Sequence, residues 1–493
     1  MTFKYHRIMI WNFLIINIRK EVLTQMKNSL NIEKYERRIT PLERIFAWSP
    51  YAIVTVVARI KGNISEAMLK KAVGKVQQRH TNLRVRIRED ENNILLFTSD
   101  GVKDIPIEIV TRESDDQWME VYHENCKIPF ELDERPAIRF ILVQSPQESE
   151  LVILSHHIIC DGMSLAYLAR DLMVHLGDPT LEVEALPNPV PVDIDNLPKE
   201  VSMNRLVKYV INRMGKKWTK NPTFFDQVDY ENLNEAYWNK YKHEMVSIEL
   251  SGTETSLLVE RCRKEGVTVN SALTTAFIGA QCVIQEDKVN SSIAIAGSVR
   301  DRLLKPAGES MGYFAGGVAL KFKYKTKIDF WENARNLHRK VKPLYTNKNM
   351  FKEMLTWAYL EPGIMESLSF KMIGGLVSSE SPRYDKLSTF SKQDDLISSL
   401  LKKQKMDNLE KPFLGTAMTN LTRLDFPTTY GSLKLDRLIM NPGGMFPLAL
   451  VSLVLGAVTC ADKLSLLIEY TQEAINLISM AKIKEKAMEF LLN

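Results

Sequence analysis

The sequence predicts an α+β protein built from two lobes, and three observations support this prediction. The chain has 493 residues, too many for one ordinary core and enough for about two to three folded units. Segments of strand-like composition alternate with amphipathic segments at helical spacing along most of the chain. A proline-rich stretch at residues 186–198, LPNPVPVDIDNLP, interrupts the alternation and marks a boundary between lobes.

The composition is that of a folded chain and excludes several classes of protein. It is 45% hydrophobic and 25% charged, which argues against disorder. A net charge of +5, with basic residues spread along the chain, does not resemble a nucleic-acid binder. The five cysteines are widely spaced and form no CxxC pair, which argues against a disulfide framework or a zinc site. We therefore expect a cytoplasmic protein with no metal ion.

Residues 1–37 are predicted to be an N-terminal extension. Its apolar run, Ile8 to Ile18, superficially resembles a signal peptide, but two asparagines interrupt it and no small-residue cleavage site follows. The run is also much shorter than the roughly 20 residues that span a bilayer. Because Lys20-Glu21-Val22 can be encoded by a purine-rich ribosome-binding sequence, one hypothesis is that the true start is Met26.

The first lobe is predicted over residues 38–190. The β-branched, apolar segment YAIVTVVARI at 51–60 predicts a buried strand. Ser65 can cap a helix over about 66–78, whose apolar residues recur at helical spacing. A second strand is expected after Arg79, further strands at 137–143 and 151–155, and a helix at about 164–176.

A linker at 191–232 contains a predicted basic amphipathic helix, Met203 to Met214, whose apolar residues form one stripe. Six basic side chains surround the stripe and follow the helix: Arg205, Lys208, Arg213, Lys216, Lys217 and Lys220. Two interpretations stay open. In the first, the stripe packs on a lobe and the charges are solvated near the helix C-terminus, where cations are favoured. Alternatively, the helix docks on an acidic carrier protein or an anionic membrane.

The second lobe is predicted over residues 233–493. It begins with a strand at 246–250 and a helix with the sequence SLLVERCRKEG, followed by an apolar helix capped at Asn270 or Ser271. Strands are expected at 292–297, 317–322 and 464–470, whereas residues 346–411 have no assignment. The charge-poor stretch 438–461 raises the question of a membrane span, but two prolines and two glycines interrupt it. A pair of buried strands fits it better.

The segment that indicates chemistry is LVILSHHIICDGMSLAYL, residues 151–168. An apolar strand ends in His156 and His157, and Asp161-Gly162 then precedes a helix. A histidine just past a strand end, in apolar surroundings, can be held as a neutral imidazole that accepts a proton. The spacing alone is equally compatible with a hydrogen-bonded core histidine followed by ordinary turn and N-cap chemistry.

This segment resembles HHxxxDG, the signature of nonribosomal peptide condensation domains, polyketide-associated acyltransferases and wax ester synthases. Chloramphenicol acetyltransferases carry the shorter HxxxD. Other segments are similar to family motifs in the family order, among them IPFELDERPAIRFILV, GSVRDRLLKPAGESMGYFAG and TNLTRLDFPTTYGSLKLDRLIMNP, and the resemblance covers roughly residues 38–475. The chloramphenicol-acetyltransferase-like superfamily that it indicates implies two lobes, each a mixed sheet packed with helices, and an active-site tunnel between them.

The resemblance also implies roles for individual residues. His157 corresponds to the family's general base, and His156 to a mostly structural histidine. Asp161 corresponds to an aspartate that pairs with an arginine of the second lobe. Arg300 is the first choice for that partner and Arg302 the second, because both fit the family's RxR spacing. The alternative for these arginines is a solvated surface pair of little energetic consequence.

Three further residues of these motifs have predicted roles. Gly162 is expected to let the backbone turn tightly under the base. Asn420 is a candidate oxyanion donor, although its segment carries Thr422 where the family has a glycine. Cys160 lies inside the motif, but the family transfers the acyl group directly, so a thiol nucleophile is disfavoured.

The function that the resemblance implies is acyl transfer from a thioester to a hydroxyl or amine acceptor. The donor is an acyl-CoA or an acyl-phosphopantetheine carrier protein, and no cofactor is expected to stay bound. Two alternatives remain: a free-standing condensation enzyme that forms an amide from carrier-bound substrates, and a non-catalytic binding protein on the same fold. No nucleic-acid partner is expected, and peripheral contact with a membrane is left open.

Overall fold

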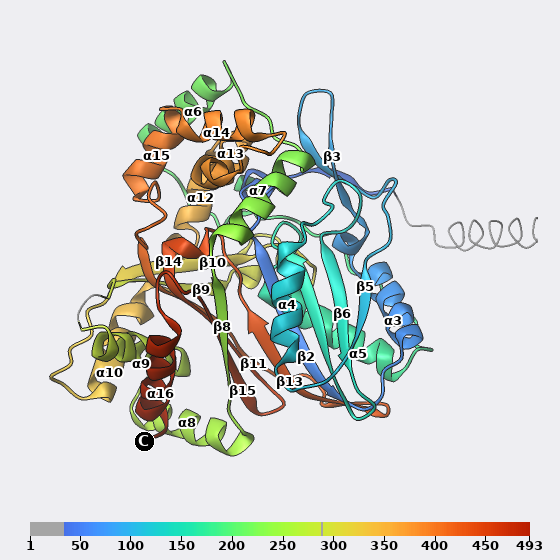
Figure 1. Ribbon diagram of the computed structural model, residues 1–493, viewed down its shortest axis with the longest axis vertical. Helices are drawn as coiled ribbons and strands as arrows, with labels where there is room; N and C mark the ends of the chain where they lie inside the picture. Colours follow the sequence, from blue (N-terminus) through green and yellow to red (C-terminus); the bar gives the residue numbers. More distant parts are fainter. Residues whose placement is uncertain (1–33, 287–288) are drawn as a thin grey trace, which may run out of the picture.

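The computed structural model describes residues 34–286 and 289–493, so the hypothesis of a start at Met26 lies outside the described residues. Two six-stranded mixed sheets, each packed with helices, form two lobes that lie side by side (Figure 1). The predicted fold class, α+β in two lobes, is confirmed.

The first sheet is antiparallel except for its parallel β5–β6 pair. Its strands, in spatial order, are β12 (Thr429–Tyr430), β13 (Leu433–Asn441), β2 (Ile53–Lys61), β7 (Glu148–His156), β6 (Ile138–Gln144) and β5 (Ile107–Thr111). The predicted strands at 51–60, 137–143 and 151–155 are therefore present. The pairing of Ile53 with His156 brings the histidine motif to the start of β2.

Three helices cover this sheet: α3 (Glu66–Arg79) and α5 (Gly162–Gly177) pack together behind it, and α4 (Gln117–Lys127) lies in front (Figure 1). As predicted, Ser65 caps α3, because its side chain accepts a hydrogen bond from the backbone N–H of Met68. Asp161 caps α5 in the same way, through the N–H of Ser164.

The second sheet is mixed, with β11 parallel to both of its neighbours. Its strands, in spatial order, are β10 (Ala315–Lys321), β9 (Ser292–Ser298), β11 (Leu414–Leu424), β14 (Val451–Cys460), β15 (Lys463–Thr471) and β8 (His243–Glu249). Its helices are α8 (Gly252–Lys264), α9 (Val269–Ile284), α10 (Phe330–Val341) and α16 (Leu477–Leu492). The predicted caps of α9 are wrong, because Thr268 has extended backbone angles and its side chain accepts from the N–H of Ser271.

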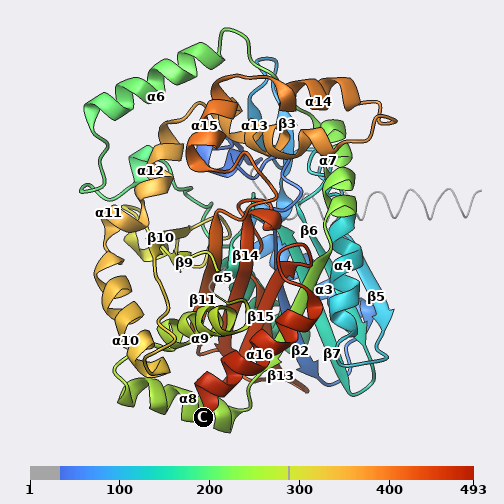
Figure 2. The same ribbon diagram turned by 60° about the vertical axis from the view of Figure 1, so that its left-hand side comes forward.

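Two features lie outside these sheets. The strand expected after Arg79 is β3 (Arg86–Glu89), which forms a separate three-stranded sheet with β4 (Leu95–Thr98) and β1 (Glu36–Arg38). The unassigned region 346–411 is largely helical, with α11 (Asn347–Met350), α12 (Lys352–Tyr359), α13 (Pro362–Ile373), α14 (Tyr384–Lys392) and α15 (Leu396–Gln404). These helices gather above the two sheets (Figures 1 and 2).

The linker contains α6 (Arg205–Trp218) and α7 (Gln227–Lys240). Helix α6 begins after Asn204 and stands at the edge of the molecule near α12 (Figure 2). Its apolar stripe does not pack on a lobe over most of its length: Leu206 is 71% exposed, and Val207 and Val210 are also exposed. Only Ile211 of the predicted stripe is buried. The interpretation in which the stripe packs on a lobe is therefore wrong for the first turns of α6.

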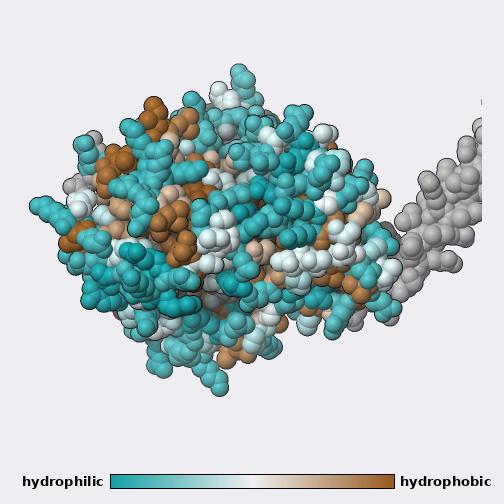
Figure 3. Space-filling view, turned by 90° about the horizontal axis from the view of Figure 1, so that it is seen from below, coloured by the Kyte–Doolittle hydropathy of each residue, from teal (hydrophilic) through white to brown (hydrophobic). Residues whose placement is uncertain are grey.

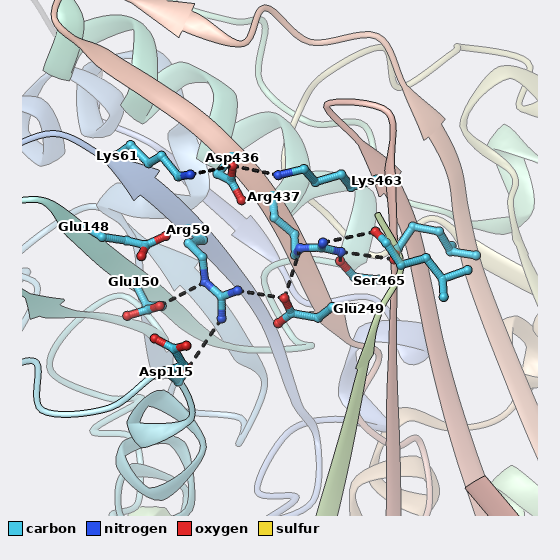
Figure 4. Close-up of polar contacts among 12 residues, drawn as sticks. Arg59, Lys61, Asp115, Glu148, Glu150, Glu249, Asp436, Arg437, Lys463 and Ser465 are labelled. Carbon is cyan, nitrogen blue, oxygen red and sulfur yellow. Dashed lines mark hydrogen bonds and ion pairs between the residues drawn. The ribbon is translucent and has the colours of Figure 1, made fainter. Parts of the chain in front are cut away.

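The C-terminal half of the chain also contributes to the first sheet. Strand β13 pairs with β2 over Lys434 to Asn441, after which the chain crosses to β14 in the second sheet. An ion-pair network joins the sheets near this strand (Figure 4). Arg59 contacts Glu150 at 3.0 Å and Glu249 of β8 at 2.7 Å, and Arg437 of β13 contacts Glu249 at 3.2 Å. The two lobes are thus joined by the chain that leaves β13 of the first sheet for β14 of the second, and by ion pairs between the sheets.

The stretch 438–461 forms the end of β13 and the whole of β14, so the prediction of buried strands is confirmed. In the part of the chain that the structure describes, no single helix is long and apolar enough to cross a bilayer. Helices α8 and α9 meet the criteria of length and composition only when taken together, across a bend of 96°. The face seen from below in Figure 3 is mainly hydrophilic, with apolar groups scattered among polar ones.

Candidate active site

A cavity of about 650 Å³ lies between the two sheets and beneath the helical region of residues 347–406. Its lining includes residues of β2 from the first sheet and of β9, β10, β11, β14 and β15 from the second. Helices α12, α13 and α15 close it with mostly apolar side chains, among them Met354 and Met365. The volume and the apolar lining are those of a site for a small molecule or an acyl chain.

His157 lines this cavity directly after the last residue of β7. Its backbone N–H donates to Ala52 O at 2.8 Å, which extends the β2–β7 pairing by one residue. In the side chain, Nδ1 lies 3.2 Å from Cys160 O and Nε2 lies 2.9 Å from Pro442 O. The rings of Phe46 and Tyr313 flank the imidazole, with centroids 5.2 and 5.6 Å away. These contacts hold the ring in one orientation.

Burial lowers the pKa of His157, although the carbonyl groups of Cys160 and Pro442 act in the opposite direction. The imidazole is therefore neutral near pH 7 and carries a single N–H, which can donate to one of the two carbonyl groups only. With the proton on Nδ1, the lone pair of Nε2 is available to accept a proton. This is the protonation state that a general base requires.

His156 is fully buried and points away from this chemistry. Its Nε2 lies 3.0 Å from Ser49 O, and its Nδ1 accepts a 3.3 Å hydrogen bond from the N–H of Ile158. Burial lowers the pKa of His156 to about 3, so the ring stays neutral. Both ring nitrogens contact only backbone groups, which fits the structural role that the resemblance implied.

The predicted ion pair between Asp161 and Arg300 is present, with 2.7 Å between Oδ1 and Nη2. Oδ1 also caps α5 through Ser164, and Oδ2 accepts from the N–H of Phe314 at 3.0 Å. Burial works to raise the pKa of Asp161, but the charge of Arg300 and the hydrogen bonds outweigh it and hold the pKa below its usual range. Both residues are buried, so the alternative of a solvated surface pair is wrong.

Arg302, the second choice, is not a partner of Asp161. Its guanidinium donates to Asn347 Oδ1 at 2.8 Å instead. The expectation for Gly162 needs a different physical reason. Its φ is not positive, but a Cβ at this position would lie 3.3 Å from Cδ2 of Leu421. A side chain at this position would therefore require Leu421 of β11 to shift by a few tenths of an ångström, and no special turn conformation is involved.

Asn420 does not line the cavity, whereas its neighbour Thr419 does. Successive side chains of a strand point to opposite faces, so Asn420 is directed away from His157. Its Oδ1 accepts a 2.7 Å hydrogen bond from the N–H of Thr422, at an irregularity in the β11–β14 pairing. The geometry does not support the predicted oxyanion role. Thr422, which replaces the family's glycine, has a φ of +63°.

Cys160 is buried, and its Sγ lies 3.1 Å from Ser155 Oγ. Burial raises the pKa of the thiol, so the thiolate that a nucleophile requires is disfavoured. Within residues 34–286 and 289–493, no group of three or more His, Cys, Asp or Glu side chains is arranged to hold a metal ion.

Sequence reasoning missed several side chains of the cavity. Phe46 and Tyr313, which flank the base, lie far apart in the sequence, and nothing in their local spacing marks them. Tyr122, His243 and Glu469 form a polar end of the cavity. A charged residue inside the otherwise apolar strand LSLLIEYT was a signal that could have drawn attention to Glu469.

By sequence, the chain is similar to condensation domains and to proteins of nonribosomal peptide synthesis. A family model described as Condensation domain matches residues 37–176. A linear gramicidin synthase of Brevibacillus parabrevis is 24% identical over 365 residues, which are 71% of this chain and 7% of that protein. The dimodular nonribosomal peptide synthase of Bacillus subtilis is 30% identical over 138 residues, 28% of this chain and 6% of that protein. The matched segments thus span less than a tenth of the length of either relative.

Solved structures share the two-lobed fold at low sequence identity. Trichothecene 15-O-acetyltransferase from Fusarium sporotrichioides gives a TM-score of 0.58 at 13% identity, covering 93% of this chain and 95% of that one. Polyketide synthase associated protein 5 from Mycobacterium tuberculosis gives 0.56 at 12% identity, covering 92% and 97%. The condensation domain of Monacolin K polyketide synthase gives 0.55 at 15% identity, covering 93% and 96%. These likenesses establish the fold.

Proposed function

We propose that this chain belongs to the superfamily of condensation domains and chloramphenicol-acetyltransferase-like acyltransferases, and that it transfers an acyl group from a thioester to a hydroxyl or amine acceptor. The observation that carries the proposal is the position of His157, a neutral imidazole in the wall of a cavity between the two lobes. The relatives are peptide synthetases, so a carrier-protein thioester is the first donor to test and an acyl-CoA the second.

In the proposed reaction, the O–H or N–H of the acceptor replaces the carbonyl of Pro442 at Nε2 of His157. His157 removes the proton as the acceptor attacks the thioester carbonyl, and the new ester or amide bond forms as the C–S bond breaks. The leaving thiolate takes the proton back from Nε2. The carbonyl of Cys160 accepts from Nδ1 throughout and stabilises the imidazolium while it carries both protons.

Tyr313 is the candidate oxyanion donor that we assign in place of Asn420. Its ring lies perpendicular to the imidazole, and it lines the cavity. Burial raises the pKa of Tyr313, so its hydroxyl keeps the proton that it would donate to the developing oxyanion. The ion pair of Asp161 with Arg300 acts at a distance from the reacting atoms, by holding the turn that carries the base.

The decisive experiment is mass-spectrometric detection of product with the purified chain. An acyl group is offered as an acyl-pantetheine carrier protein or as acyl-CoA, together with a small alcohol or a small primary amine. A mass increase equal to the acyl group, on either acceptor, supports the proposal and identifies its donor and bond type. No product from any of the four pairings, under conditions in which the chain is folded, would favour a binding protein on the same fold.

A further inference from the structure

The wall of the cavity formed by β15 and β8 contains a buried carboxyl group that the proposed reaction does not use. Glu469 lines the cavity and is 6% exposed. It accepts a 3.3 Å hydrogen bond from Tyr122 Oη, which itself accepts a 2.8 Å hydrogen bond from Asn441 Nδ2. No ion pair within the described residues involves Glu469. A buried carboxylate without a cation is costly, so a positive group from a ligand would be stabilised here.

His243 lies on the neighbouring strand β8, on the same face of the sheet as this carboxyl group. Glu469 pairs with Met245 and Thr471 pairs with His243, so the side chains of Glu469 and His243 lie on one face of the sheet, diagonally across the strand pair. Both ring nitrogens of His243 are buried, and neither has a hydrogen-bond partner in the part of the chain that the structure describes. Burial lowers the pKa of His243 to about 3, so the imidazole is neutral and offers one acceptor nitrogen.

Aromatic rings complete this end of the cavity. The ring centroids of Tyr237 and Trp238, on α7, lie 5.2 and 4.3 Å from that of His243, and both residues line the cavity. Aromatic rings attract cations through their quadrupole. Carboxylate, neutral imidazole and aromatic rings are all groups that favour a positively charged ligand.

This polar end is joined to the base by one short loop. Asn441 contacts Tyr122, and the next residue, Pro442, has its carbonyl oxygen 2.9 Å from Nε2 of His157. Gly443 follows with a φ of +64°, and its N–H donates to Asn441 Oδ1. A ligand that presents one group to the base can therefore present a second group to Glu469.

We propose that the acceptor bound in this cavity carries a protonated amino group in addition to its reacting group, and that Glu469 binds this amino group. His243 accepts a hydrogen bond from it, and Tyr237 and Trp238 surround it. The inference rests on the proposed function and deepens it by naming a class of acceptor, the amino alcohols and diamines. The other charged residues of the lining do not compete for a cation: Asp161 forms an ion pair with Arg300, and the charge of Lys352 acts on its neighbour Glu353 on α12.

The titration of the neighbouring groups supports this assignment. Burial raises the pKa of Glu469 to about 7. The groups that face it are Tyr122 and Cys126 of α4 and Tyr237 of α7, and burial raises all three pKa values, so these groups are neutral. His123 of α4, near His243, has a pKa lowered by burial and is also neutral near pH 7. Binding of a cation should therefore strengthen as pH rises through about 7 and weaken as pH falls below it.

The test is direct binding of two matched probes to the intact chain, by calorimetry, without any thioester. The probes are 5-aminopentan-1-ol and pentane-1,5-diol, which differ in one terminal group. At pH 8 the native chain is expected to bind the amino alcohol at least about tenfold more tightly than the diol, because a charge-assisted contact replaces a neutral one. Glu469→Gln should abolish this preference and leave the affinity for the diol unchanged.

Glu353→Gln is the matched control, because it removes another carboxyl group of the same cavity and should keep the preference. For the native chain alone, the preference should decline by up to about tenfold per pH unit below pH 7, as Glu469 becomes protonated. Equal binding of the two probes, a preference that survives Glu469→Gln, or a preference that is constant from pH 6 to 8 would each overturn the proposal. Because no turnover is measured, these outcomes are independent of whether acyl transfer is detected.

Discussion

At the scale of single residues, the chemistry of this site depends on where two adjacent histidines point. His156 and His157 follow one another on the chain, yet the first is held by the backbone of Ser49 and the second lines the cavity. The alternation of side chains along β7 separates them. One histidine consequently stabilises the strand end and the other is free to react.

We expect His157→Ala to lower kcat by about 10²–10⁴, the usual effect of removing a general acid–base group, while the chain stays folded. The measurement is turnover with whichever donor and acceptor give product, with circular dichroism to check folding. Cys160→Ala is the control within the same motif and should retain activity within a few-fold. Near-native turnover of His157→Ala would show that the histidine is not the base. Loss of turnover in Cys160→Ala, with turnover retained in His157→Ala, would indicate the thiol instead.

The pH dependence of the reaction should reflect the lowered pKa of His157. The base must be neutral to accept a proton, and burial shifts its pKa below 6.5, so activity should persist to lower pH than for a free histidine. The acid limb of kcat/KM is therefore expected below pH 6.5. It should be measured with an uncharged alkanol as acceptor, so that Glu469 does not contribute to the profile. A midpoint at or above pH 6.5 would contradict this assignment of the base.

At the scale of the elements, β11 has a cavity-lining residue and a strained backbone position close together. Thr419 lines the cavity, while three residues later Thr422 has a left-handed backbone conformation at the irregularity beside β14. Such a φ is strained for a β-branched residue, and the hydrogen bond from its N–H to Asn420 helps to hold it. The glycine of the resembling families would adopt this conformation without strain.

Thr422→Gly is accordingly expected to raise the free energy of unfolding by about 1 kcal/mol, because relief of strain outweighs the added flexibility of the unfolded chain. Urea denaturation of the purified proteins measures this change. Thr422→Ala, which keeps a Cβ, should give a smaller gain. The interpretation fails if the glycine variant is less stable than the native chain.

Helix α6 leaves part of its apolar stripe exposed next to a row of basic side chains. Tyr209 is 64% exposed as well, and Lys208 lies over the ring of Tyr359 on α12, a helix that lines the cavity on its other side. Carrier proteins are acidic, and their surface would complement Lys216, Lys217 and Lys220 in charge. The exposed apolar turns would supply the uncharged part of the same contact.

Reversing Lys216, Lys217 and Lys220 to Glu should therefore raise KM for a carrier-bound donor by about tenfold or more, and leave KM for a free acyl-pantetheine unchanged. Added salt should weaken the native interaction in the same way, because this attraction is screened over about 10 Å at 0.1 M. An unchanged KM for the carrier-bound donor would exclude the docking role. Loss of sedimentation with anionic liposomes, with carrier kinetics unaffected, would indicate a membrane surface as the partner.

At the scale of the whole molecule, a side chain of the second lobe helps to position the catalytic turn of the first lobe. Arg300 from the second lobe contacts Asp161 and Ser164 at the start of α5, and also binds the carbonyl groups of Gly308 and Ser310. The network of Arg59, Glu249 and Arg437 joins the sheets elsewhere (Figure 4). The base is therefore positioned by residues far apart in the sequence.

Asp161→Asn and Arg300→Ala should each lower the free energy of unfolding by up to about 5 kcal/mol, because each leaves a buried partner uncompensated. Each should also reduce turnover. The double variant should lose less than the sum, because paired groups couple. A double-mutant cycle in urea denaturation and in turnover tests this. Asp161→Asn combined with Arg302→Ala is the control and should be additive, because Arg302 contacts Asn347. Additive losses for Asp161 and Arg300 would contradict their coupling.

Much of the local structure could be predicted from the sequence, because it depends on neighbouring residues. The capping of α3 by Ser65, the strand that ends at His156 and the helix after Asp161 all follow from composition and spacing within about 15 residues. The motif resemblance added the pairing of Asp161 with Arg300, across 139 positions of the chain. Local patterns of this kind could be read because the residues that produce them are close together in the sequence.

What only the tertiary structure decided is which distant segments meet. The crossing of β13 into the first sheet brings Pro442 to His157, and the helices of residues 347–404 close the cavity. The direction of Asn420, the exposure of α6 and the placement of Glu469 and His243 on one face of the second sheet likewise follow from contacts between elements. The physical reason is that periodicity fixes which face of an element is apolar, whereas the partner of that face is set by the packing of the whole chain.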